Sequence, residues 1–252
     1  MLSRAQIKHI NSLHSKKHRY QDEMFIAEGS KIVLDLISNN IKVEYLVATS
    51  DWISNANVSD DIKIIESTEV EIKKCTALST ATNVIAIFHF PVFKNTEIKN
   101  SLSILLDDVQ DPGNLGTIIR TADWFGIKNI FCSKGTVDIY NPKVIQATMG
   151  AIAGINIKYC NLEELIEKHS SEDFPVYGTF MEGNNIYSNN LNSKGFIVMG
   201  NEGKGVSYDI KALITTKLTI PSYNPNETIS ESLNVATATA IICSEFRRNS
   251  IK

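Results

Sequence analysis

The sequence of 252 residues contains only four cysteines, and none of them belongs to a C-x-x-C pair. They stand far apart in the chain, at Cys75, Cys132, Cys160 and Cys243. No group of histidines completes a set of zinc ligands either. The sequence therefore predicts reduced, mostly buried thiols and no structural metal.

Long apolar stretches are also missing. No segment approaches the roughly 20 apolar residues that a membrane-spanning helix requires. The N-terminal residues, MLSRAQIKHINSLHSKKHR, lack the continuous apolar segment of a secretion signal. We therefore expect a cytoplasmic protein without membrane association.

The chain has no excess of positive charge. It contains 25 lysine and arginine residues against 28 aspartate and glutamate residues, so its formal net charge is −3. No molecule-wide positive field attracts nucleic acid, and a polyanion must be bound locally. The shares of apolar residues (43%) and charged residues (21%) are those of a folded protein and exclude intrinsic disorder.

Glycine and proline are scarce in the first part of the chain. Gly29 is the only glycine before Gly113, and no proline precedes Pro91. Because glycine permits sharp turns and close approach to a ligand, we expect backbone-mediated chemistry in the second part. The polar stretch 94–101 is the expected boundary between a domain of residues 1–95 and a domain of residues 102–252.

Helical and strand-like segments alternate in both parts, which indicates an α/β fold. In the first part, Ser3 and Ser30 are expected to cap helices, and strands are expected at 43–49, 62–66 and 84–90. In the second part, strands are expected at 103–109, 129–133, 155–159, 176–180, 196–200 and 217–220, and a last helix at about 231–248. Nearly unbroken apolar strands predict an open parallel sheet with helices on both faces.

Three polar loops follow strands of this predicted sheet. They are DDVQDPGNLG at 107–116, GNEGKGVS at 200–207, and the stretch from Ile220 to ESLNVA at 231–236. Ligands of open parallel sheets bind beyond the carboxyl ends of the strands. None of the loops is a phosphate-binding glycine motif of the mononucleotide or dinucleotide type. Their side chains and accessible amides favour a polar, neutral or zwitterionic ligand with an adenine-like edge.

The strings DDVQDPGNLGTIIRTADWFGI, IVMGNEGKGVS and ESLNVATATAI resemble the three ordered motifs of the SpoU (TrmH) family. This family of the SPOUT class comprises S-adenosylmethionine-dependent RNA ribose 2′-O-methyltransferases. The motifs span about residues 104–246. The first part of the chain is similar to the family's N-terminal substrate-binding domain, a small ribosomal-protein-like α/β domain that favours ribosomal RNA over transfer RNA.

The resemblance implies a deep trefoil knot in the C-terminal domain, whose crossings bind S-adenosylmethionine. Knots are nearly absent among protein folds, so the residues alone would predict an unknotted sheet. The implied catalytic residues are Asn114, Arg120, Glu202, Ser232 and Asn234. The implied cofactor-binding residues are Thr179, Gly200, Ile220 and Leu233. The twelve residues between Ile220 and Leu233 form a longer link than the family usually has.

The implied reaction requires a base, and the family's proposed base corresponds to Arg120. The 2′-hydroxyl must lose its proton as the bond to the methyl group forms. A guanidinium has a pKa above about 12, so removal of a proton by Arg120 alone is unfavourable. We favour the hypothesis that Arg120 binds the phosphate beside the target ribose and steers or relays the proton. The leaving thioether is neutral, so no metal is expected.

Several of these residues have simpler interpretations. Asp107, Asp108 and Asp111 are more typical of turns and helix caps than of a magnesium site. Ser232 and Asn234 are suited to capping the last helix as well as to lining a site. Trp52 and Trp124 are expected to pack in the protein rather than to stack on bases.

A basic segment opens the chain. Residues 1–20 include no aspartate or glutamate. The RNA-binding residues expected there are Arg4, Lys8, Lys16, Lys17 and Arg19. Such residues contact phosphates and add no base specificity. A basic helix face that is merely solvated is the alternative.

The sequence thus predicts methyl transfer from S-adenosylmethionine to a ribose 2′-hydroxyl of RNA, above all a guanosine of 23S ribosomal RNA. The alternatives are a transfer RNA substrate and a non-catalytic RNA-binding or ribosome-assembly factor with the same fold. We expect a homodimer joined through the knotted domain, with RNA as its partner.

Overall fold

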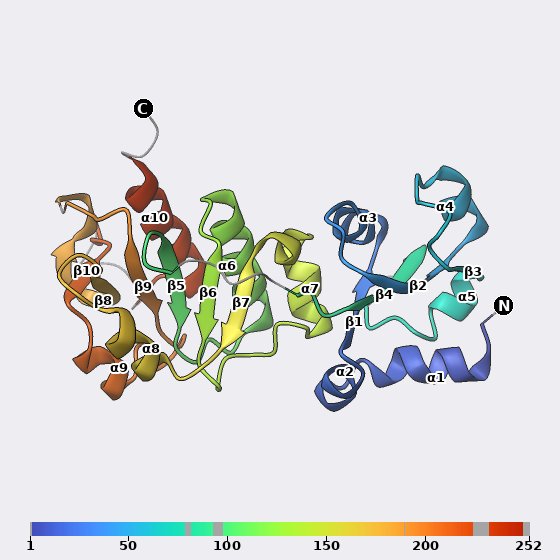
Figure 1. Ribbon diagram of the computed structural model, residues 1–252, viewed down its shortest axis with the longest axis horizontal. Coiled ribbons are helices and arrows are strands. Elements are labelled where there is room, and N and C mark those ends of the chain that lie inside the picture. The colour runs from blue at the N-terminus through green and yellow to red at the C-terminus, as the bar shows by residue number, and fades with distance from the viewer. Residues whose placement is uncertain (1, 79–81, 93–97, 189, 224–231, 249–252) are drawn as a thin grey trace. The chain divides into compact units, whose positions relative to one another are not determined.

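The computed structural model describes residues 2–78, 82–92, 98–188, 190–223 and 232–248, and Figure 1 shows its elements. The chain forms two compact units. Unit 1 consists of Met1–Val92 and Asp138–Ala153, and unit 2 consists of Phe93–Val137 and Gly154–Lys252. The segment Asp138–Ala153 therefore packs with the N-terminal part, although it lies far along the sequence. Most of the expected boundary stretch, residues 93–97, falls outside the described residues.

Unit 1 is built on a four-stranded sheet in the order β1-β4-β2-β3. Its strands are β1 (Met24–Glu28), β2 (Val43–Ala48), β3 (Ile64–Glu66) and β4 (Val84–His89). Strand β4 pairs antiparallel with β1 and β2, and β2 pairs parallel with β3. The helices are α1 (Arg4–Ser12), α2 (Lys16–Asp22), α3 (Ser30–Ser38), α4 (Ser50–Asn55), α5 (Glu69–Ile72) and α7 (Pro142–Thr148). Helix α7 packs against β1, and a 3₁₀ turn, Ala151–Gly154, follows it.

Helix α1 begins where the sequence predicts. The Ser3 hydroxyl accepts a hydrogen bond from the Gln6 amide at 3.2 Å, and the Gln6 side chain accepts one from the Ser3 amide at 2.8 Å. This capping box satisfies two amides that the first turn leaves free. Ile10 and Leu13 are fully buried beneath the helix, and burial of each aliphatic side chain contributes about 1.5–3 kcal/mol.

The prediction for Ser30 is wrong. Gly29, with φ of 93°, occupies the N-cap position of α3, and Ser30 is the first helical residue. The Ser30 hydroxyl accepts a hydrogen bond from the indole nitrogen of Trp52 at 2.9 Å instead. Trp52 is 4% exposed, which confirms its packing role.

Unit 2 contains a six-stranded sheet in the order β10-β8-β9-β5-β6-β7, and every pair of neighbours is parallel. Its strands are β5 (Leu102–Leu106), β6 (Asn129–Cys132), β7 (Asn156–Tyr159), β8 (Val176–Asn185), β9 (Gly195–Met199) and β10 (Thr216–Thr219). Its helices are α6 (Pro112–Trp124), α8 (Leu162–His169), α9 (Tyr208–Ala212) and α10 (Val235–Arg248), with a 3₁₀ turn at Ile186–Ser188. The predicted parallel α/β domain is confirmed.

The strand order places two of the three polar loops at one edge of unit 2. Strands β5 and β9 are neighbours and are buried along their whole length. The loops after β5 and β9 therefore start side by side at the carboxyl edge, which is where open parallel sheets bind ligands. Helix α10 packs against α6, so its N-terminal residues belong to the same unit as both loops (Figure 1).

The four cysteines are free thiols, as predicted. Cys75, Cys132 and Cys243 are buried, and Cys160 is half-buried. Burial raises the pKa of the Cys243 thiol to about 12, so this thiol is unreactive at neutral pH.

Trp124, by contrast, does not pack as expected. Its side chain is 85% exposed at the end of α6. Among the helices that the structure describes, none is long and apolar enough to cross a membrane.

Candidate active site

Glu202 joins the loop after β9 to the loop after β5. One of its carboxylate oxygens accepts a hydrogen bond from the Gln110 amide at 3.1 Å. The other accepts from the Asp111 amide at 3.1 Å and from the side-chain amide of Asn114 at 3.0 Å. A single exposed carboxylate thus holds the start of helix α6 and the residues that precede it.

Asn114 extends this connection to the third loop. Its side-chain oxygen accepts a hydrogen bond from the side-chain amide of Asn234 at 2.9 Å. The oxygen of Asn234 in turn accepts from the amides of Ala236 and Thr237, at 2.9 and 3.3 Å, and so caps α10. The three side chains form a directed chain, in which Asn234 donates to Asn114 and Asn114 donates to Glu202. We call these three residues the amide–carboxylate chain.

The loop after β9 is folded tightly by Asn201. Its side-chain oxygen accepts from the amides of Gly203 and Lys204, both at 3.0 Å. Its side-chain nitrogen donates to the carbonyl of Asp108 at 2.7 Å. A Cβ on Gly200 would lie 2.3 Å from the backbone of Gly205, so only glycine permits this fold. Asn201 thereby presents the neighbouring Glu202 toward the loop after β5.

The three aspartates after β5 stabilise turns and a helix start, as the simpler interpretation predicts. Asp107 accepts from the Ser207 amide at 2.7 Å, and Asp111 caps α6 by accepting from the Asn114 amide at 2.8 Å. Asp108 adopts a left-handed conformation and is bound by the Ser133 hydroxyl. Over the described part of the chain, no group of three histidine, cysteine, aspartate or glutamate residues gathers into a candidate metal site.

The surroundings of Glu202 stabilise its ionised form. Partial burial would by itself raise the pKa of this carboxyl. The hydrogen bonds from the Asn114 side chain and from the Asp111 and Gln110 amides outweigh that effect and hold the pKa below its ordinary value. Glu202 is therefore a carboxylate at neutral pH and accepts hydrogen bonds only.

The candidate cofactor residues border the same edge of the sheet. The Thr179 hydroxyl on β8 donates to the carbonyl of Val198 on β9 at 3.2 Å, two residues before Gly200. Ile220 follows β10 and is half-buried. Leu233 precedes α10 and is 51% exposed. Residues 224–231, which connect the last two, fall outside the described residues.

Two implied catalytic residues do not join the amide–carboxylate chain. Arg120 is exposed on α6 and forms no ion pair within the described residues. Ser232 is exposed, and the cap of α10 comes from Asn234. The expected start of this helix at about residue 231 is therefore early by about one turn, and α10 begins at Val235.

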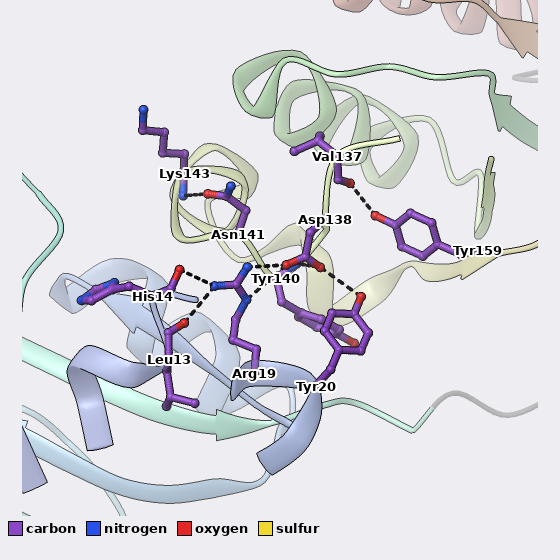
Figure 2. Close-up of polar contacts among 10 residues, drawn as sticks. All are labelled: Leu13, His14, Arg19, Tyr20, Val137, Asp138, Tyr140, Asn141, Lys143 and Tyr159. Carbon is purple, nitrogen blue, oxygen red and sulfur yellow. Dashed lines mark hydrogen bonds and ion pairs between the residues drawn. The ribbon is translucent and has the colours of Figure 1, made fainter. Parts of the chain in front are cut away.

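The basic segment of unit 1 divides into exposed and buried residues. Arg4, Lys8, Lys16 and Lys17 are exposed on α1 and α2. Arg19 is 2% exposed, so its assignment as an RNA-binding residue is wrong. Figure 2 shows its guanidinium between Asp138, at 3.1 Å from Nε, and the carbonyls of Leu13 and His14, both at 2.9 Å.

The residues that the motifs did not single out are Asn201 and Asp138, the buried partner of Arg19. An asparagine directly after a strand, followed by glycines, is a signal for a side-chain-stabilised turn, so Asn201 was detectable. Arg19 and Asp138 are 119 residues apart in the chain, and no local pattern connects them.

Comparison with known proteins identifies the family. The SpoU rRNA Methylase family model matches residues 101–244, and the MRM3-like substrate binding domain model matches residues 4–86. The 23S rRNA (guanosine(2553)-2′-O)-methyltransferase RlmP of Bacillus subtilis is 30% identical over 242 residues, which cover 96% of this chain and 95% of that protein.

Solved structures agree over the whole length. A protein from Porphyromonas gingivalis assigned to the TrmH family superposes with a TM-score of 0.87 at 37% identity, covering 98% of this chain and 99% of the other. An AdoMet-bound rRNA methyltransferase from Sinorhizobium meliloti superposes with a TM-score of 0.86 at 29% identity, covering 100% and 97%.

These matches bear out the predictions of the family, of its enzymatic activity and of S-adenosylmethionine as its cofactor. The two matched models follow one another along the chain, with the substrate-binding part first. The chain belongs to the SpoU family of S-adenosylmethionine-dependent RNA methyltransferases.

Proposed function

We propose that this protein methylates a ribose 2′-hydroxyl of large-subunit ribosomal RNA, at a guanosine. The observation that carries the proposal is the amide–carboxylate chain, which brings residues from all three family motifs into one hydrogen-bonded group. The guanosine and the 23S target are supported by the name of the Bacillus subtilis relative, which spans nearly the full length of the chain.

The cofactor is assigned to the edge formed by Thr179, Gly200, Ile220 and Leu233. The fit is supported by Gly200, where the tightly folded loop leaves room for backbone but for no side chain. These residues offer neutral amides, carbonyls and a hydroxyl, which suit the adenine and ribose of a zwitterionic ligand. S-adenosylmethionine, when bound, supplies a methyl group on a positively charged sulfur.

Asn114 holds the site together and keeps some hydrogen-bonding capacity. A side-chain amide has two N–H donors and two acceptor lone pairs. Glu202 takes one donor and Asn234 takes one lone pair, so one donor and one lone pair remain for the RNA. Asn114 therefore contacts the substrate in an orientation that Glu202 and Asn234 impose.

Arg120 is assigned to the RNA phosphate beside the target ribose. Its guanidinium stays protonated, so it acts by binding an anion and by steering the hydroxyl proton rather than by removing it unaided. The absence of a carboxylate partner among the described residues leaves its charge available for a phosphate. Ser232, exposed beside Leu233, is assigned to the same ribose-facing side.

A homodimer and a trefoil knot complete the proposal. Trp124 lies four residues after Arg120 on α6, hence on the same helix face, and its 85% exposure supports a contact with a second copy of the chain. The knot is supported by the fold match to relatives of the SPOUT class. A cytoplasmic location follows from the ribosomal substrate.

The test is methyl transfer from tritiated S-adenosylmethionine to ribosomal RNA from a strain that lacks the gene, followed by mapping of 2′-O-methyl groups. We expect one guanosine of 23S RNA to gain the label. Label in transfer RNA alone would redirect the proposal to that substrate. Absence of label from every RNA would support the non-catalytic alternative, whether or not the protein binds S-adenosylmethionine.

A further inference from the structure

Two lysines of unit 2 converge on one aromatic ring. The ammonium of Lys211 on α9 lies 5.5 Å from the ring centre of Phe180 on β8. The ammonium of Lys217 on β10 lies 5.7 Å from the same centre. The ring attracts each cation, so two positive charges gather around Phe180.

Among the described residues, no carboxylate pairs with these two lysines. Within the residues that the structure describes, neither Lys211 nor Lys217 forms an ion pair, whereas Lys128 of the same unit is paired with Asp123 at 3.4 Å. The sequence neighbour Asp209 lies in the first turn of α9 and is not bonded to either lysine. A negatively charged ligand at this ring would be attracted by both ammonium groups.

A second aromatic side chain lies on the same short helix as Lys211. Tyr208 is 86% exposed and lies three residues before Lys211 on α9, so the two share a helix face. Exposed aromatic rings next to cations are what proteins use to stack single-stranded nucleobases. We call Phe180, Tyr208, Lys211 and Lys217 the Phe180 face.

The Phe180 face adjoins the candidate active site along the chain. Phe180 follows Thr179 directly, and Lys217 is three residues before Ile220. The amide of Ser207, the residue before Tyr208, is held by Asp107 at the end of β5. Phe180 and Lys217 are therefore close in sequence to residues assigned to the cofactor edge, and α9 is anchored at its start to the carboxyl end of β5.

We propose that the Phe180 face binds single-stranded RNA next to the methylated nucleotide. This inference rests on the proposed function, because it names where unit 2 itself holds the RNA. Lys211 and Lys217 bind backbone phosphates, and Tyr208 stacks on one base. The contact is independent of base identity, since every base offers a stacking face.

The test compares Lys211→Ala/Lys217→Ala with Lys158→Ala/Lys168→Ala, which removes the same charge from exposed positions of unit 2. Binding of a fluorescein-labelled oligouridylate of about 15 nucleotides is measured by anisotropy over a range of salt concentrations. We expect the first variant to bind more weakly and to lower the salt slope by about 1.4, the value for two lost phosphate contacts on a single strand. The control keeps the wild-type slope.

Tyr208 is tested separately. Tyr208→Ala should weaken binding by about 5- to 100-fold, and Tyr208→Phe should retain it because the ring is kept. S-adenosylmethionine binding by calorimetry, unchanged in all variants, shows that each one is folded.

The outcomes separate this inference from the proposed function. Equal RNA binding by the variants and the control overturns the inference, whether or not the wild type transfers methyl groups. A change in sedimentation with unchanged RNA binding also overturns it, and assigns the face to a protein contact. Loss of RNA binding in a protein whose wild type transfers no methyl group supports the face while the proposed function fails.

Discussion

The side-chain amide of Asn234 donates a hydrogen bond to the side-chain oxygen of Asn114 at 2.9 Å, across 120 residues of sequence. The direction of this bond is fixed at both ends. The oxygen of Asn234 caps α10, so only its nitrogen is free to reach Asn114. Asn114 must then offer its own nitrogen to Glu202. The cap of one helix thus sets the orientation of a side chain on another.

The lowered pKa of Glu202 makes its contribution to stability depend on pH. A carboxyl whose pKa is lower in the folded state stabilises the fold above the unfolded pKa, near 4.3, and loses that effect as pH falls through the folded value. Glu202→Gln should lower the free energy of unfolding by about 1 kcal/mol at pH 6, because charged hydrogen bonds become neutral ones at an exposed site. Urea unfolding at several pH values measures it.

The pH profile distinguishes this account from a merely local defect. The difference between wild type and Glu202→Gln should shrink as pH falls below about 4. Glu167 is an exposed glutamate on α8. Glu167→Gln serves as the matched control and should leave the free energy of unfolding unchanged at every pH measured. A Glu202→Gln effect that stays constant down to acid pH would show that the carboxylate charge is not involved.

Arg120 is expected to act on the RNA and not on the methyl donor. Arg120→Ala should abolish methyl transfer and leave S-adenosylmethionine affinity nearly unchanged, because the exposed guanidinium lies outside the amide–carboxylate chain. Transfer of a tritiated methyl group measures the activity, and calorimetry measures the affinity for S-adenosylmethionine. Lys158→Ala is the control for both. Wild-type turnover in Arg120→Ala would remove this residue from the mechanism.

The strand edges were predictable from the sequence, and the side-chain connections were predictable only in part. Apolar runs such as Ile104–Leu106 located the buried parallel strands, and the rule that ligands bind at carboxyl edges selected their loops. The resemblance to the family assigned Asn114, Glu202 and Asn234 to one site. Neither source indicated that they form a hydrogen-bonded chain, because the direction of each bond depends on which atoms the helix caps already occupy.

The errors have physical causes of the same kind. Ser30 was expected to be a cap, but Gly29 takes the cap position and the Ser30 hydroxyl binds the Trp52 indole 22 residues away. Arg19 was assigned to RNA binding because its sequence neighbours are basic, but its ion-pair partner, Asp138, lies 119 residues away. Strand β1 was not predicted because its five residues, MFIAE, do not alternate between apolar and polar side chains. Contacts that are distant in sequence decided each case.

The buried pair of Arg19 and Asp138 should be essential for the stability of unit 1. Arg19→Met leaves the carboxylate of Asp138 buried without its cation. Hydrogen bonds from the Tyr20 hydroxyl at 3.0 Å and from the Tyr140 amide at 3.3 Å remain, and neither donor carries a charge. Removal of one partner of a buried ion pair costs about 3–5 kcal/mol. Chemical denaturation measures this loss in the free energy of unfolding.

Lys17→Met is the matched control for Arg19→Met. This exposed neighbour on α2 should change stability by less than about 0.5 kcal/mol and should weaken RNA binding. Equal stability of the two variants would show that the Arg19 pair contributes nothing beyond its packing.

Trp124 should determine the oligomeric state. A large aromatic side chain at an interface is often a dominant contact, so Trp124→Ala should raise the dimer dissociation constant by about 30-fold or more. Sedimentation velocity over a range of concentrations measures the change. Val70→Ala removes an exposed apolar side chain of unit 1 and should sediment as the wild type does. A monomeric wild type would contradict the proposed homodimer.

The most direct test of the account is a double-mutant cycle on Asn114 and Asn234, with the rate of methyl transfer as the readout. If Asn234 acts by orienting Asn114, the account predicts that Asn114→Ala/Asn234→Ala is no slower than Asn114→Ala alone. Rate losses that multiply in the double variant would show that the two residues act independently, and would contradict the claim that the three loops work as one hydrogen-bonded site.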